Sequence, residues 1–217
     1  MSLNFITETA ASVVSHIKRQ FGDESGVQIT DTDILRWINQ AQREIAMIAK
    51  VTQAVATTDV VLGTYEYQLP DMNAIEISSI RYNKRPVQTM EFPMAEHYLQ
   101  ENDPEHSSTG SPEWWYRWAD VVYFWPTPDQ DIVAGLEVFY IKSPDAVVDT
   151  SAPLGLPDKY YEALIQFCMS KAYELDEDFQ ASAGAKQAYN DRLGQTFEED
   201  SNAGTMMYPK ISIVDME

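Results

Sequence analysis

The sequence has little cysteine and little histidine. Its 217 residues include one cysteine, Cys168, and three histidines, His16, His97 and His106, which fall in separate segments. A single cysteine excludes an intrachain disulfide framework and fits a reducing compartment at synthesis. Metal sites need clustered ligands, so these scattered histidines are expected at the surface or at its boundary. Cys168 lies on the apolar stripe of an expected helix, which predicts a buried structural thiol and not a nucleophile.

Glycine is also sparse, and long apolar runs are missing. The nine glycines form no glycine-rich turn ahead of a helix, as a phosphate-binding loop requires. A G-x-S-x-G motif for acyl transfer is absent too. No segment approaches the roughly 20 apolar residues of a membrane span. Residues 1–21 have the pattern of an amphipathic helix and not that of a signal peptide. We therefore expect no catalytic residue, no cofactor, no metal site and no membrane partner.

Basic residues are few relative to acidic ones. Fifteen lysines and arginines stand against 34 acidic residues, which gives a formal net charge of −19 at pH 7. A surface this acidic repels phosphate backbones, so ordinary nucleic-acid binding is not expected. The charge keeps a protein soluble, and it also suits a passage through which DNA slides without sticking. The acidic run at residues 174–178 lacks the alternating ligands and central glycine of a calcium loop, so we interpret it as a solvated turn between helices.

Helical periodicity is present at both ends of the chain. Residues 5–21 place apolar side chains on one face of a helix. Residues 30–50 begin with helix-capping side chains and continue with a narrow apolar stripe. The helical period returns over residues 157–175 and continues weakly over residues 179–198. These four segments predict helices that pack together.

The middle of the chain has the period of two that is typical of strands. Residues 55–69, 74–88, 114–125 and 135–141 predict about five strands, with a turn at Asn83-Lys84 and a bulge at Ser78-Ser79. The predicted fold class is α+β: a helical bundle formed by the N- and C-terminal helices, with an inserted antiparallel β-sheet or small barrel domain. The expected helical domain comprises residues 1–52 and 153–200, the β domain residues 53–152, and an extended C-terminal tail residues 201–217.

Four of the five tryptophans lie in one short stretch, PEWWYRWADVVYFWPTP, at residues 112–128. Its alternation predicts a tight aromatic hairpin with two different faces. One face is expected to fill a small core, and it carries Trp114, Tyr116, Trp118, Tyr123 and Trp125. Trp115 and Phe124 point to the other face, where either side chain is a candidate anchor for a protein partner.

The C-terminal segment MMYPKISIVDM, residues 206–216, alternates apolar Ile211 and Ile213 with polar neighbours. Such alternation suits addition of a strand to a partner's sheet. The further partner-binding candidates here are Tyr208 and Val214. The competing interpretation is disorder in the free protein, and both hold if the segment orders only on docking.

The order of these segments resembles that of head–tail connector, or adaptor, proteins of tailed bacteriophages, of the kind found in short-tailed phages. The resemblance spans about residues 5–198 and depends on the order of its pieces. These are the helix DTDILRWINQAQREIA, the sheet segment GTYEYQLPDMNAIEISSIRYN, the hairpin PEWWYRWADVVYFWPTPDQD, the strand LEVFYIKSPD, and the helix LGLPDKYYEALIQFCMSKAYEL leading to AKQAYNDRLG.

The resemblance implies a non-enzymatic virion protein at the head–tail junction, present in the host cytoplasm during assembly. Such adaptors form a ring, usually a dodecamer, beneath the portal protein. They extend the channel for genomic DNA without binding it specifically, and they present a docking surface for tail or nozzle proteins. Their helices build the ring, and a C-terminal segment commonly reaches into the portal.

Two other functions stay open at this point. A carbohydrate-binding module built on the hairpin at residues 113–125 requires Trp115 and Phe124, or their neighbours, to be exposed and coplanar. A hydrolase with paired carboxylates is the third hypothesis, since an acidic chain brings some pair to a suitable separation by chance.

Overall fold

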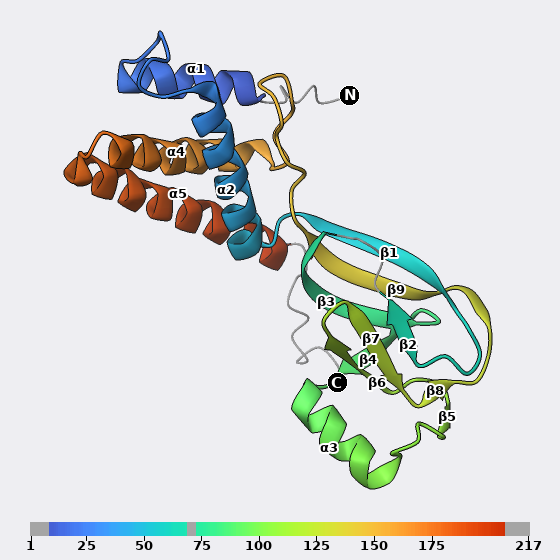
Figure 1. The fold of residues 1–217 in the computed structure, drawn as a ribbon. Coiled ribbons are helices and arrows are strands. Elements are labelled where there is room, and N and C mark those ends of the chain that lie inside the picture. The colour runs from blue at the N-terminus through green and yellow to red at the C-terminus, as the bar shows by residue number, and fades with distance from the viewer. Residues whose placement is uncertain (1–8, 69–72, 207–217) are drawn as a thin grey trace, which may run out of the picture. The chain divides into compact units, whose positions relative to one another are not determined.

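The computed structural model describes residues 9–68 and 73–206, the last eight of these by their backbone only (Figure 1). The chain divides into two compact units. A helical unit is made by the residues up to Val51 and from Pro144 onward, and a β unit is made by Thr52–Ser143. We describe each unit by itself.

Four α-helices form the described part of the helical unit: α1 (Ala10–Phe21), α2 (Asp31–Ala49), α4 (Tyr161–Leu175) and α5 (Phe179–Met206), with a short 3-10 turn at Asp158–Tyr160. Helix α1 ends at Gly22, whose φ of 87° is the left-handed conformation that glycine adopts without steric cost. Helix α2 begins where the Thr30 hydroxyl accepts a hydrogen bond from the Asp33 backbone N–H.

Helix α4 lies at the centre of the helical core. Its packing partners are α5, α2 and α1, and the antiparallel pair α4–α5 is the most extensive of these contacts (Figure 1). Leu164, Cys168 and Met169 are fully buried, together with Ile17 of α1 and Ile38 of α2. A helix buried on nearly all sides must be apolar all round, which explains why its sequence is the most hydrophobic of the helices.

The described residues of the β unit form a seven-stranded sheet in the order β1-β9-β3-β4-β6-β7-β2. The strands are β1 (Gln53–Val60), β2 (Glu66–Gln68), β3 (Ala74–Tyr82), β4 (Arg85–Thr89), β6 (Trp114–Trp118), β7 (Val121–Trp125) and β9 (Ile132–Lys142), and β5 (Thr109–Gly110) pairs separately with β8 (Thr127–Pro128). The predicted α+β class is confirmed. The sheet is mixed where an antiparallel one was expected, because helix α3 (Phe92–Asn102) forms a crossover that makes β4 and β6 parallel.

A turn and a bulge in the sheet lie where the sequence predicts them. Asn83 and Lys84 both have positive φ, 46° and 64°, and form the two-residue turn between β3 and β4. The register of β3 against β9 shifts between Ile77 and Ser79, which confirms the predicted bulge.

Helix α5 extends beyond residue 200, where the helical domain was expected to end. It continues to Met206, so helix covers the first six residues of the segment expected to be an extended tail from residue 201. Extending an existing helix adds one backbone hydrogen bond per residue without the cost of a new nucleus, so a weak apolar period does not end it. Residues 207–217, with Tyr208, Ile211, Ile213 and Val214, lie outside the described residues.

Candidate functional surfaces

The aromatic hairpin is formed by β6 and β7, and its first face carries four large rings. Trp114 pairs with Trp125 and Tyr116 with Tyr123 across the strands. The indoles stack with centroids 5.3 Å apart, and the phenol rings stack at 4.8 Å. Helix α3 covers this face, where Trp114 and Tyr116 are buried with the α3 residue Leu99. These four rings lie together in a small core, on the face that the alternation indicates.

The second face of the hairpin is also buried, which corrects the expectation for Trp115 and Phe124. Their exposed fractions are 6% and 1%, so neither side chain is available to a partner. Both pack into the main core of the β unit, with Ile80, Leu136 and Val138. The physical reason is the curl of the sheet, visible in Figure 1, which encloses the face opposite α3.

Trp118 corrects the expectation in the opposite sense. It was expected in the aromatic core, and it is 58% exposed at the end of β6 beside the turn. Phe92, the first residue of α3, stacks on the indole with centroids 4.2 Å apart. The hairpin therefore offers one partly covered exposed tryptophan, and the coplanar platform that a carbohydrate-binding module needs is not formed by Trp115 and Phe124.

Asp103, at the end of α3, ties the following loop to the hairpin. Its carboxylate accepts hydrogen bonds from the Ser107 backbone N–H and hydroxyl, from the Ser108 N–H and from the Trp125 indole N–H, at 2.8–3.0 Å. Burial raises the pKa of this carboxyl, but these hydrogen bonds outweigh burial and hold the pKa well below its usual range. A charged, buried carboxylate thus connects Trp125 to the loop that follows α3.

Asp23 plays the same part in the loop between α1 and α2. The backbone N–H groups of Val27, Gln28 and Ile29 donate to its carboxylate at 3.0, 2.7 and 2.8 Å. The hydrogen bond from Ile29 is the largest cause that lowers the pKa of Asp23, to about 2, against the opposing effect of burial. The loop is therefore set by one side chain, and it delivers the chain to the start of α2.

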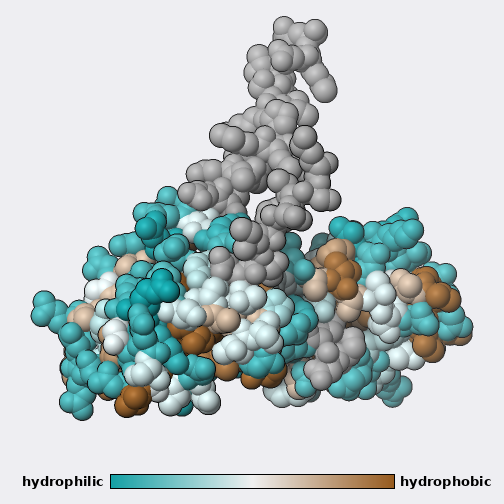
Figure 2. Space-filling model, turned by 90° about the horizontal axis from the view of Figure 1, so that it is seen from above, coloured by the Kyte–Doolittle hydropathy of each residue, from teal (hydrophilic) through white to brown (hydrophobic). Residues whose placement is uncertain are grey.

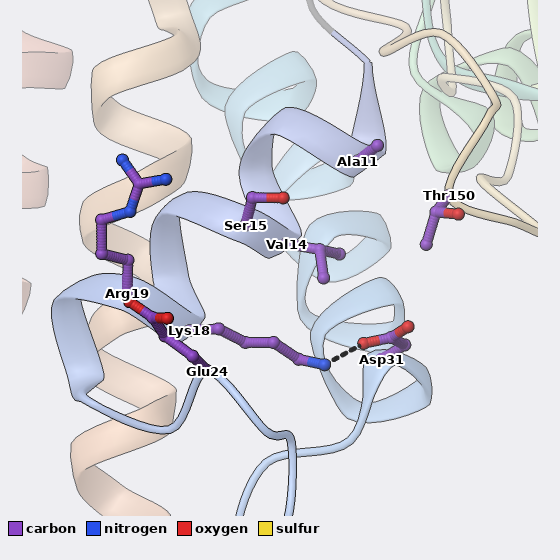
Figure 3. Close-up of a pocket in the computed structure, with 8 residues that line it drawn as sticks. All are labelled: Ala11, Val14, Ser15, Lys18, Arg19, Glu24, Asp31 and Thr150. Atoms are coloured by element: carbon purple, nitrogen blue, oxygen red, sulfur yellow. Dashed lines mark ion pairs between the residues drawn. The ribbon is translucent and has the colours of Figure 1, made fainter.

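A hollow of about 430 Å³ lies between α1, the start of α2 and Thr150 (Figure 3). Lys18 crosses it and forms an ion pair with Asp31 at 2.5 Å, and Arg19 and Glu24 lie at its rim. Lys18, the basic group that enters this hollow, is therefore already paired with a carboxylate. Its lining carries no nucleophile held by a base, which makes it a structural feature of the α1–α2 junction.

Metal and thiol chemistry find no support in residues 9–68 and 73–206. No group of three or more histidine, cysteine, aspartate or glutamate side chains there is placed to hold a metal ion. Cys168 is fully buried, and burial raises the pKa of its thiol far above the usual value. Within the same described ranges, no helix has the length and apolar character needed to cross a membrane.

A second hollow, of about 500 Å³, lies on the outward face of α2. Among the described residues it is lined by Arg36, Asn39, Gln40, Arg43, Glu44 and Met47. Figure 2 shows exposed apolar residues in brown among the teal hydrophilic surface. Met47 of α2 is 53% exposed. Sequence reasoning missed this hollow. The available signal was the 4-3-4 spacing of Arg36, Gln40, Arg43 and Met47, which repeats on the side of α2 away from its apolar stripe.

Comparison with known proteins gives one family. A family model described as SU10 adaptor protein matches residues 8–209. The match includes both units and nearly the whole chain. A search of curated proteins found no match.

Proposed function

The chain belongs to the SU10 adaptor protein family, and from this premise we propose that it docks beneath the portal ring of a tailed bacteriophage, extends the DNA channel and provides the surface to which the tail attaches. Membership makes it a structural adaptor of the virion. We further propose that the protein lies at the head–tail junction in the virion and is present in the host cytoplasm during assembly.

The observation that carries the proposal is the family match over residues 8–209, because it includes the helical unit and the β unit together. A match to one unit alone would support only a shared fold piece. The buried hairpin rings add support, since aromatic side chains that fill two cores stabilise the fold, and Trp115 and Phe124 are not exposed for a small ligand to stack on. We infer a scaffold role with no enzymatic activity.

Charge supports the channel part of the proposal. The formal net charge of −19 repels DNA phosphates, and a channel wall must let the genome pass without specific binding. Ring formation, with a dodecamer as the expected state, would bring many copies of this charge around one passage.

The C-terminal segment is the proposed portal contact. Ile211 and Ile213 alternate with polar Lys210 and Ser212 in the manner of a strand that adds to a partner's sheet, and Tyr208 and Val214 are the further contact residues that we propose. They follow directly on α5, which ends at Met206.

Electron microscopy of the protein mixed with its portal tests the proposal. We expect an added ring of density on one end of the portal. A variant that ends at Met206 should attach more weakly, while the isolated variant keeps its helical content. Portals that stay bare at protein concentrations well above the portal concentration would contradict the docking role, and unchanged attachment of the shortened variant would contradict the role of the segment.

A further inference from the structure

Among the described residues, the hollow on α2 combines two arginines with one exposed apolar side chain, Met47, in a chain that is otherwise strongly acidic. The one carboxylate in this described lining, Glu44, accepts a hydrogen bond from the Tyr189 hydroxyl at 3.1 Å. Arg36 and Arg43 lie two turns apart on the outward face, and Met47 lies one turn further. The Arg36 side chain is 72% exposed and pairs only at the surface with Asp33, at 3.2 Å. Arg43 is exposed and forms no ion pair with any residue that the structure describes. This surface suits a partner that is both acidic and apolar.

The turn between α4 and α5 has those properties. Leu175 ends α4 and is 55% exposed, and Phe179 begins α5 and is 70% exposed. Between them lie Asp176, Glu177 and Asp178, all exposed. Large apolar side chains on a turn of three carboxylates form a protruding apolar and acidic surface, which matches the hollow in both respects.

The turn is also held in one conformation. The Asp176 N–H donates to the Ala172 carbonyl and the Asp178 N–H to the Tyr173 carbonyl, which closes the end of α4. The Asp178 carboxylate accepts from the Ala181 N–H at 3.0 Å and caps the start of α5. Phe179 therefore projects from a preorganised turn, so docking it costs little conformational entropy.

We propose that the α4–α5 turn of one copy docks into the α2 hollow of the next copy, with Phe179 beside Met47 and the acidic side chains beside Arg36 and Arg43. The inference rests on the proposed function, because it names the contact by which copies form a ring. The two surfaces are different parts of the helical unit (Figure 1), and in the proposed heterologous contact each copy gives its turn to one neighbour and its hollow to another. Heterologous contacts generate rings or filaments, whereas a self-complementary surface stops at a dimer.

Cysteine cross-linking tests the contact directly. The variant carrying Met47→Cys and Phe179→Cys is oxidised both free at high concentration and bound to portal rings. Cys168 is fully buried and stays out of the reaction. We expect a ladder of linked chains beyond the dimer in at least one of the two settings. Either single variant should give no ladder, because each link requires one cysteine from each surface.

The same samples distinguish the contact between copies from the proposed docking on the portal. Portal rings decorated with protein that forms no ladder overturn the contact and leave the proposed function standing. A ladder without attachment to the portal supports the contact and contradicts the proposed function. Products that stop at the dimer show a self-complementary contact and overturn the inference.

A charge exchange gives an independent readout. Arg43→Glu should weaken self-association, measured by sedimentation or by occupancy of the portal ring, by about tenfold or more. Adding Asp176→Lys to Arg43→Glu should restore association, which a simple loss of stability would not allow. Arg19→Glu makes the same charge change on α1 and serves as the matched control. Equal effects of Arg43→Glu and Arg19→Glu, or no restoration, overturn the inference.

Phe179 provides the apolar half of the test. Phe179→Ser should weaken self-association by about tenfold, because a large exposed ring that fills a hollow is the kind of side chain that dominates interface energetics. Phe197→Ser removes a ring from the same helix that is 50% exposed and should leave association unchanged. An equal response of the two variants contradicts the proposed docking of Phe179.

Discussion

At the residue scale, two buried aspartates fix the conformation of the loops that follow them. Asp23 and Asp103 each gather hydrogen-bond donors from the loop that follows them. Sequence inspection did not single out either residue, because an aspartate in a polar loop is usually a solvated side chain. Only the folded loop brings backbone N–H groups to one carboxylate.

Replacing Asp103 tests the network that connects the loop after α3 to the hairpin. Asp103→Asn keeps the shape but removes the charge, and its amide has a donor where the carboxylate had an acceptor. We expect a loss of about 1–3 kcal/mol in the free energy of unfolding, since donors from Ser107, Ser108 and Trp125 compete for one oxygen. Urea denaturation followed by tryptophan fluorescence measures it. Asp120→Asn, at an exposed aspartate in the hairpin turn, is the control.

Asp23 predicts a pH dependence. Its folded pKa is lowered from 3.8 to about 2. A lowered folded pKa contributes stability that is fully present above the unfolded value and is lost as pH falls toward 2. Asp23→Asn should therefore flatten the fall in stability over that window, and thermal unfolding at pH 5, 4, 3 and 2 measures the slope. A variant with the same acid slope as the parent chain would show that Asp23 carries no such coupling.

Cys168 predicts a difference in thiol reactivity between the folded and unfolded chain. Its side chain is fully buried in the helical core, and burial raises the pKa of the thiol. We expect a thiol reagent to leave the native protein unlabelled and to label the unfolded chain completely in urea. Rapid labelling without denaturant would show that the core around α4 opens readily.

At the scale of elements, the alternation of the hairpin assigns each ring to a face, and the structure places Trp114 and Tyr116 on one face and Trp115 and Phe124 on the other. What covers each face depends on distant segments. Helix α3 arrives from residues 92–102, and the opposite core includes strands β3 and β9. A local pattern therefore identifies sides, while exposure is a property of the whole sheet, as Trp118 shows.

Helix α3 should contribute to hairpin stability, and Leu99 is the α3 side chain that tests this contribution. Leu99 is 4% exposed against Trp114 and Tyr116, so Leu99→Ala should cost about 2–4 kcal/mol in the free energy of unfolding. Met94→Ala changes the same helix at a position that is 65% exposed and should be nearly neutral. Chemical denaturation measures both, and equal costs would mean that α3 does not form the hairpin cover.

At the scale of the whole molecule, the chain has separate cores in its two units. Among the described residues, the helical core is built from the helical unit, and both β clusters are built from residues of Thr52–Ser143. The order of helices, strands and helices in the sequence predicts an inserted domain of this kind. The hollow on α2 was not predictable in this way, because an outward helical face has no strong hydropathy signal.

A fragment of residues 52–143 should fold without the helical unit. Its ends meet where the Lys142 N–H donates to the Thr52 carbonyl at 2.8 Å, so cutting there leaves the paired strands β1 and β9 intact. We expect near-ultraviolet circular dichroism of the tryptophan cluster and a cooperative urea transition. A fragment with neither signal would show that the β unit depends on the helices.

The hydrogen bond between Thr52 and Lys142 has a consequence for the evolution of the sequence. The chain enters and leaves the β unit through neighbouring residues, so this stretch can be exchanged, lengthened or shortened as a cassette while the surrounding helices keep their own packing. A lineage that meets a new binding target can thus alter one module and conserve the other.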